Sequence, residues 1–111
     1  MANIDQYRQL VKDILNEYST HKPTYGEVEV ELIFDSKRDH YQLVHAGWSK
    51  RRRIYGCTIH IDLKDDKIWI QNDGTEVGIA NVLVERGVPQ QDIVLAYHAP
   101  YLREFTDFAV G

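Results

Sequence analysis

The sequence of 111 residues lacks several features that mark particular classes of protein. It has a single cysteine, so no intramolecular disulfide can form, which favours a reducing cytoplasm. Its apolar runs are much shorter than the roughly 20 residues that span a bilayer. Its first residues lack the basic and apolar regions of a signal peptide. We therefore expect a cytoplasmic protein that has no membrane partner.

Basic residues are also in the minority. The chain has 13 Lys and Arg against 17 Asp and Glu, which gives a formal net charge of -4. Nucleic-acid-binding proteins usually carry a basic excess, because contacts with phosphates supply most of their affinity. The overall charge therefore argues against a dedicated DNA-binding domain. Local basic clusters remain at the candidate basic turn (Lys50, Arg51 and Arg52) and at Lys37-Arg38.

What the sequence does contain is enough apolar surface for one core. Hydrophobic residues make up 43% of the chain, which predicts a single domain over residues 1–111. Residues 4–20 are expected to form an amphipathic helix, because their apolar side chains recur at intervals of three and four. These side chains are Ile4, Tyr7, Leu10, Val11, Ile14, Leu15 and Tyr18. Lys22-Pro23 should end the helix.

The middle of the chain shows the alternation that is typical of strands. Four strands are predicted, joined by short turns that favour an antiparallel meander. Their ranges are 27–35, 40–48, 53–63 and 68–71. Helical spacing returns after Gly78 and should stop at Gly87, followed by Val88-Pro89. Residues 93–97 could form a short strand or a buried turn, and 100–108 could form a last short helix.

The predicted fold class is therefore α+β. An N-terminal amphipathic helix packs on a four-stranded antiparallel meander, which one or two short C-terminal helices follow. A two-residue hairpin at Asp65-Asp66 would pair Leu63 with Ile68 and Ile61 with Ile70 on the core face. It would also pair Asp62 with Trp69 and His60 with Gln71 on the second face.

The second face combines aromatic and polar side chains. With a turn over 49–52, the residues predicted to share it are Tyr41, Leu43, Ile54, Thr58, His60, Asp62 and Trp69. Either the C-terminal segment or another protein chain could cover this face. Protein interfaces are rich in Trp and Tyr with a few polar neighbours.

The chemistry-bearing residues do not assemble into a recognisable catalytic motif. His60 and Asp62 would point the same way on a strand, with Tyr41 or His45 nearby, but zinc requires three or four converging ligands. Cys57 is expected to face the core as a small hydrophobe. Asp65, Asp66 and Asp73 are at predicted turns, where aspartate is common, so they need no catalytic explanation. The sequence therefore predicts no catalytic residue, no metal and no cofactor.

Several stretches follow one another in an order that extends along nearly the whole chain. They are Tyr7-Arg8, Asp39–Leu43, Gly47-Trp48, Arg53–Cys57, Ile59–Asp62, Lys67–Gln71, Asp73–Glu76, Gly78–Ala80, Gly87–Pro89, Asp92–Leu95 and Pro100. This order resembles the XisI family, the controlling factors of fdxN-element excision in cyanobacteria. Two positions depart from the resemblance. Asp66 stands where a turn glycine is expected, and Val82 stands where an acid is expected.

The resemblance implies a non-enzymatic regulatory protein that contacts an XisH-like partner and, in this way, associates indirectly with a site-specific recombinase and DNA. A homodimer is a further expectation. The expected contact residues are Tyr41, Trp48, Arg53, His60 and Trp69. Three alternatives stay open: an inhibitor or immunity-type partner of a nuclease-like protein, a weak DNA-binding factor that uses the basic turn, and an enzyme that uses His60 and Asp62.

Overall fold

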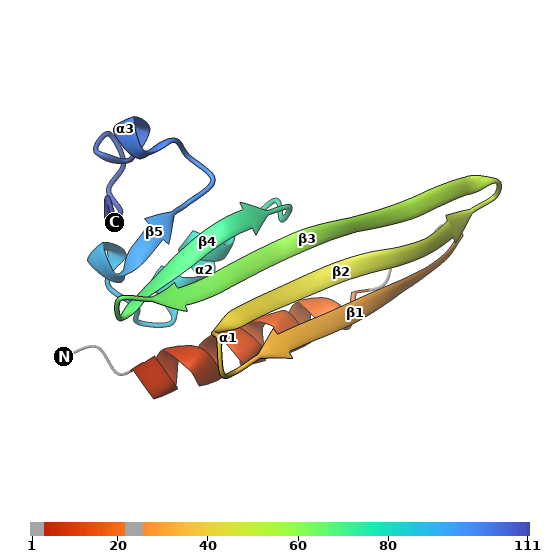
Figure 1. Ribbon diagram of the computed structural model, residues 1–111, viewed down its shortest axis with the longest axis horizontal. Helices are drawn as coiled ribbons and strands as arrows, with labels where there is room; N and C mark the ends of the chain where they lie inside the picture. The colour runs from red at the N-terminus through yellow and green to blue at the C-terminus, as the bar shows by residue number, and fades with distance from the viewer. Residues whose placement is uncertain (1–3, 22–25) are drawn as a thin grey trace.

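The computed structural model describes residues 4–21 and 26–111 and has an α+β fold. Helix α1 (Ile4–Ser19) packs on one face of a five-stranded sheet whose strand order follows the chain (Figure 1). The strands are β1 (Glu27–Asp35), β2 (His40–Ser49), β3 (Arg52–Lys64), β4 (Lys67–Asp73) and β5 (Ile93–Leu95). The predicted fold class and first helix are confirmed. The stop predicted at Lys22-Pro23 lies outside the described residues.

The number and direction of the strands correct the prediction of four antiparallel ones. The first four strands do form an antiparallel meander, but β5 adds a fifth strand that runs parallel to β4. Helix α2 (Ile79–Glu85) lies between them in the chain and carries it back to the start of the neighbouring strand, as a parallel pairing requires. The all-buried segment of β5 has no alternation that would distinguish a strand from a buried turn.

The core lies between α1 and the sheet. Val11, Ile14 and Leu15 are fully buried there, as their helical spacing predicts. They pack with Ile59, Ile61, Ile68 and Ile70 from the central strands.

At the start of α2, the carboxylate of Asp73 accepts a hydrogen bond from the Ile79 amide at 2.7 Å.

The ends of the C-terminal helices agree only in part with the sequence pattern. Gly87, with φ 96°, follows the end of α2, as the predicted helix stop requires. The last helix, α3 (Pro100–Arg103), is shorter than the predicted 100–108, although Pro100 does occupy its first turn.

None of the helices in the described residues is both long and apolar enough to span a membrane.

The hairpin between β3 and β4 follows the predicted register at its tip. Leu63 pairs with Ile68, Ile61 with Ile70, and Asp62 with Trp69. Asp65 and Asp66 have φ values of 54° and 60°, which is the left-handed geometry of a type I′ turn. The aspartate at position 66 therefore adopts the conformation that usually favours glycine.

Two β-bulges overturn the face assignments farther from the turns. One between Leu43 and Val44 shifts the register so that Tyr41 pairs with Ile61, which moves Tyr41 and Leu43 to the core face. The same bulge separates the face of Ile54 from that of His60 and Asp62. Ile54 pairs with Gly47, as the predicted turn requires, and lies on the side of α1. A second bulge pairs His60 with Asn72 instead of the predicted Gln71. An extra residue in one strand changes the face of every residue beyond it.

The molecule is elongated, with extents of 47 × 29 × 25 Å. Figure 1 shows why: the joined ends of β2 and β3 project past both α1 and β4. We call residues 44–57 the arm. The first half of β1 accompanies the arm and pairs with β2 as far as Trp48.

Candidate interface on the open face of the sheet

The face of β1, β2 and β3 opposite α1 carries the candidate functional surface, which we call the open face. Its side chains come from alternate strand positions and form cross-strand rows. Along the arm these rows are Glu27–Trp48–Arg53, Glu29–Ala46–Tyr55 and Glu31–Val44–Cys57. The three glutamates are exposed, as the alternation of the first strand predicts.

The arm exposes an aromatic and cationic stack. The side chains of Trp48 and Tyr55 are 51% and 71% exposed, which is unusual for such large rings. The Arg53 guanidinium carbon lies 5.5 Å from the Trp48 ring centroid and 5.7 Å from that of Tyr55. Cation–π contacts at these distances hold the guanidinium between the rings. Trp, Tyr and Arg are the residues that most often dominate protein interfaces.

A polar cluster lies farther along the open face, toward β4. The Asp62 Oδ1 atom lies 2.7 Å from His40 Nδ1 and 2.8 Å from His60 Nε2. Gln71 donates from Nε2 to Asp62 Oδ2 at 3.2 Å. We call His40, His60 and Asp62 the histidine cluster. Sequence reasoning joined His60 to Asp62 but missed His40, because the unforeseen bulge in β3 reverses the face of residues 40–43.

Tyr41 is the predicted contact residue that the structure removes from this surface. It is completely buried beneath α1, and its hydroxyl donates to Asp39 Oδ1 at 2.8 Å. Burial raises the pKa of its phenol, and the hydrogen bond to Asp39 raises it further. The expectation that Tyr41 shares a face with His60 was wrong, for the register reason given above.

Trp69 lies on the same side of the sheet as Asp62, but the chain's own C-terminal segment covers part of it. Its indole N–H donates to the Lys64 carbonyl at 3.0 Å. The cations of Lys64 and Arg103 lie 4.2 and 5.7 Å from the ring centroid. Gly111 borders the same ring. Of the two covers considered for this face, the structure shows the C-terminal segment, which reaches Trp69. Trp48 and Tyr55 on the arm are largely exposed.

The candidate basic turn is at the tip of the arm. Lys50, Arg51 and Arg52 are all exposed there. The second basic cluster, Lys37-Arg38, follows β1 at the opposite end of the meander, as predicted, and Arg38 forms an ion pair with Asp35 at 3.1 Å. The two basic clusters therefore do not form one continuous patch on a single chain.

Cys57 lies on the open face of the arm and is exposed, so the prediction that it faces the core was wrong. Burial of its sulfur by neighbouring atoms nevertheless raises the pKa of the thiol. The thiol donates weakly to the Ile59 carbonyl at 3.3 Å. A thiol with a raised pKa is a poor nucleophile, which does not favour a catalytic role.

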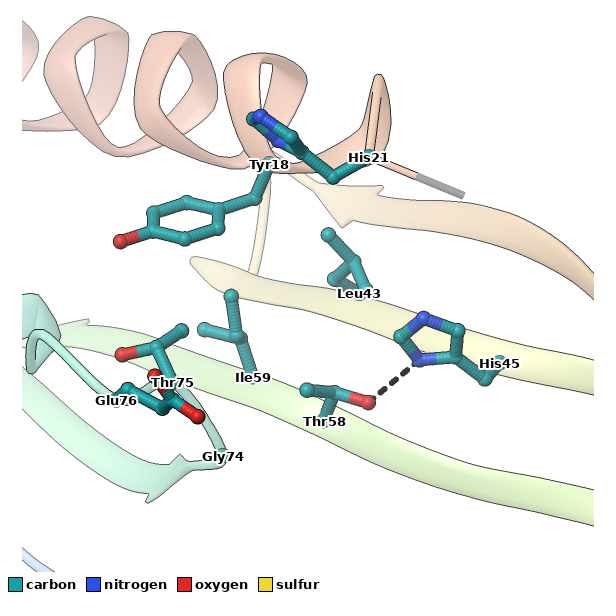
Figure 2. Close-up of a pocket in the computed structure, with 9 residues that line it drawn as sticks. All are labelled: Tyr18, His21, Leu43, His45, Thr58, Ile59, Gly74, Thr75 and Glu76. Atoms are coloured by element: carbon teal, nitrogen blue, oxygen red, sulfur yellow. Dashed lines mark hydrogen bonds between the residues drawn. The ribbon is translucent and has the colours of Figure 1, made fainter. Parts of the chain in front are cut away.

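A pocket of about 230 Å³ opens on the other face, between the end of α1 and the sheet. Figure 2 shows Tyr18 and His21 above it, and His45 and Thr58 joined by a hydrogen bond of 2.6 Å. A hydroxyl beside an imidazole resembles a nucleophile and its base, which also need a third group to orient the base. Among the residues that the structure describes, no carboxylate is hydrogen-bonded to His45.

The comparisons with known proteins agree with the order of motifs in the sequence. The family model described as XisI protein matches residues 1–110. The crystal structure of a XisI-like protein from Anabaena variabilis is 45% identical, covers 98% of this chain and 100% of its own, and superposes with a TM-score of 0.93. The fdxN element excision controlling factor XisI of the same organism is 31% identical. It covers 95% of this chain and 96% of its own, with a TM-score of 0.81. No curated protein sequence matches the chain. A match over almost the whole length, in sequence and in fold, makes this chain a member of the XisI family.

Proposed function

We propose that this protein is a non-enzymatic accessory factor in the excision of a DNA element, and that it acts by binding an XisH-like protein through the open face of its arm. The support for a role in excision is its 31% identity to a protein known as an excision controlling factor. The support for protein contact is the aromatic and cationic stack of the arm.

The exposed stack of Trp48, Arg53 and Tyr55 is the observation that carries this proposal. The stack is held by the antiparallel pairing of β2 with β3, which makes it a pre-organised surface. Covering both rings in a complex would remove a large apolar area from water, at roughly 25 cal/mol per Å². Little conformational entropy would be lost in doing so, because the rings already have fixed neighbours.

The charges around the stack favour a protein partner over DNA. Glu27 and Glu29 lie in the same cross-strand rows as the aromatic residues, and Glu31 lies in the next row. A row of carboxylates repels phosphates, whereas it suits a partner surface that combines apolar and basic side chains. The same open face could also bind a second copy of the chain, and any association with recombinase and DNA would then be indirect.

Co-purification with the XisH-like protein is the first test, read by size-exclusion chromatography with light scattering. We expect a stable stoichiometric complex with the wild type, and Trp48→Ala should weaken it at least tenfold. The matched control is Tyr101→Ala, which removes another exposed aromatic side chain, on α3. Equal effects of the two substitutions would argue against the arm as the binding surface.

The single cysteine provides a second readout on the same face. Cys57 stands in the row next to Tyr55, so a bound partner should slow its modification by a maleimide. We expect protection in the complex but not in a mixture with an unrelated protein. Unchanged modification in a complex that does form would place the partner on another surface.

Two of the three alternative functions, the inhibitor and the DNA-binding factor, make different predictions for that complex. An inhibitor or immunity-type protein would suppress a nuclease activity of the partner, whereas an accessory factor would leave or raise it. Direct DNA binding through Lys50, Arg51 and Arg52 would show a steep dependence on salt and would be lost when all three are replaced by Ala. Salt-dependent DNA binding by the chain alone would favour that alternative.

A further inference from the structure

We propose that the histidine cluster binds a divalent transition-metal ion, with His40, His60 and Asp62 as its protein ligands. The proposal is independent of the proposed partner contact and goes beyond it. Sequence reasoning found two of these ligands, too few for a site, and therefore predicted no metal. The third ligand comes from the neighbouring strand, where the β-bulge places it.

The donor atoms converge on one point. His40 on β2 pairs with Asp62 on β3, and His60 stands two residues before Asp62 on the same face. One available ligand atom from each of the three residues lies within 4.8 Å of the other two. A tetrahedral ion with bonds near 2.0 to 2.1 Å needs its ligand atoms roughly 3.3 Å apart. Small rotations that lengthen the two contacts to Asp62 Oδ1 would therefore admit the ion.

Neighbouring amides hold the ligands in place. Gln71 donates to Asp62 Oδ2, the carboxylate oxygen that the histidines do not contact. The Gln42 amide lies 3.5 Å from His60 Nδ1, the ring nitrogen not aimed at Asp62, and with its Oε1 turned toward that nitrogen it would accept the N–H of a metal-bound imidazole. Groups of this kind fix the orientation of metal-bound imidazole and carboxylate. The ligands also stand on two paired strands, which position side chains more rigidly than loops do.

The donor set indicates which class of ion would bind. Two imidazoles and one carboxylate suit zinc and its neighbours in the first transition series, whereas magnesium and calcium prefer oxygen ligands alone. The side chains of His40, His60 and Asp62 are 53%, 29% and 19% exposed, so an ion can enter from solvent. The same opening leaves a coordination position for water.

Cobalt(II) titration tests the proposal, because tetrahedral cobalt absorbs in the visible range. We expect one cobalt per wild-type chain, displaced by zinc. His40→Ala and Asp62→Asn should each weaken cobalt binding at least tenfold. His98→Ala is the matched control, since His98 lies outside the cluster, and it should bind as the wild type does.

Thermal unfolding with and without zinc gives a second measurement. An ion that binds only the folded chain raises Tm, and the rise should be present in the wild type and in His98→Ala but lost in His40→Ala. Circular dichroism before titration verifies that each variant is folded. His40 is more than half exposed, so its replacement should leave the fold intact. Absence of cobalt bands in the wild type, or bands of equal strength in folded His40→Ala, would overturn the proposal.

Discussion

At the scale of single residues, one ion pair anchors α1 to the start of β2. Arg8 donates to both carboxylate oxygens of Asp39, from Nε at 2.7 Å and from Nη2 at 3.0 Å. The Tyr41 hydroxyl, buried between helix and sheet, donates to the same carboxylate. The Arg8 hydrogen bonds hold the pKa of Asp39 below its ordinary value, despite the opposing effect of burial. Asp39 is therefore the centre of a network that joins α1 to β2.

Asp39→Asn should destabilise the protein by about 2 kcal/mol, because hydrogen bonds to a charged group contribute roughly 1.5 to 3 kcal/mol. Asn tolerates the positive φ of 59° at this position, so the variant tests the charge and not the backbone. Urea unfolding at pH 7 measures the difference. Asp107→Asn, at an exposed position, is the control and should change stability by less than about 0.5 kcal/mol.

The same variant makes a pH prediction. A carboxyl whose pKa is lower in the folded state adds stability above its unfolded pKa, and this stability is lost as pH falls through the folded value. The difference in unfolding free energy between the wild type and Asp39→Asn should therefore be largest near neutral pH and shrink in acid. A difference that stays constant from pH 7 into acid would contradict the role given to Asp39.

At the scale of elements, the arm depends on close contact between β1 and β2. Gly47 pairs with Val28, and a Cβ atom at position 47 would lie 2.0 Å from the Glu27 carbonyl oxygen. Backbone atoms cannot yield as a flexible side chain can. The position therefore requires glycine for reasons of space.

Gly47→Ala should cost about 2 to 3 kcal/mol, because β1 would have to move away from β2. Gly56→Ala is the matched control on the same arm, since a Cβ there would meet nothing within 4 Å. Urea unfolding compares the two variants, and hydrogen exchange should show the loss of protection in the first half of β1. Equal stability of both variants would mean that the two strands are not in such close contact.

At the scale of the whole molecule, the C-terminal segment is held to the sheet through Trp69. Arg103 stacks near the indole ring and donates hydrogen bonds to the carbonyls of Ala96 and His98. Lys67 donates to the Gly111 carbonyl at 2.8 Å, and Ala109 bridges to Val94 of β5. These contacts make the end of the chain part of the globule rather than a tail.

Trp69→Ala should lower the free energy of unfolding by about 2 kcal/mol, less than for a fully buried tryptophan. Hydrogen exchange over residues 96–111 should rise with it, since the ring no longer holds Arg103. Trp48→Ala serves as the control for tryptophan removal and should be nearly neutral, because Trp48 is half exposed on the arm. A larger loss of stability in Trp48→Ala than in Trp69→Ala would contradict the structural role given to Trp69 and the binding role given to Trp48.

Local periodicity and turn chemistry are sufficient to predict several features of this protein from its sequence. The spacing of Val11, Ile14 and Leu15 predicts the buried side of α1, and the Asp65-Asp66 turn predicts the pairing of Leu63 with Ile68. Near a tight turn, the turn itself sets the register. The order of motifs was also sufficient to identify the family.

The faces that residues occupy beyond the bulges depend instead on long-range strand pairing. The β-bulge in β3 is not predicted by any local sequence pattern. It nevertheless buries Tyr41 and brings His40 beside His60 and Asp62. The parallel pairing of β5 likewise depends on a crossover through α2, over a distance that local patterns do not encode. Long-range strand pairing brings the candidate metal ligands together. It also places Trp69 next to the C-terminal segment and leaves the arm exposed. Such pairing depends on the packed sheet as a whole.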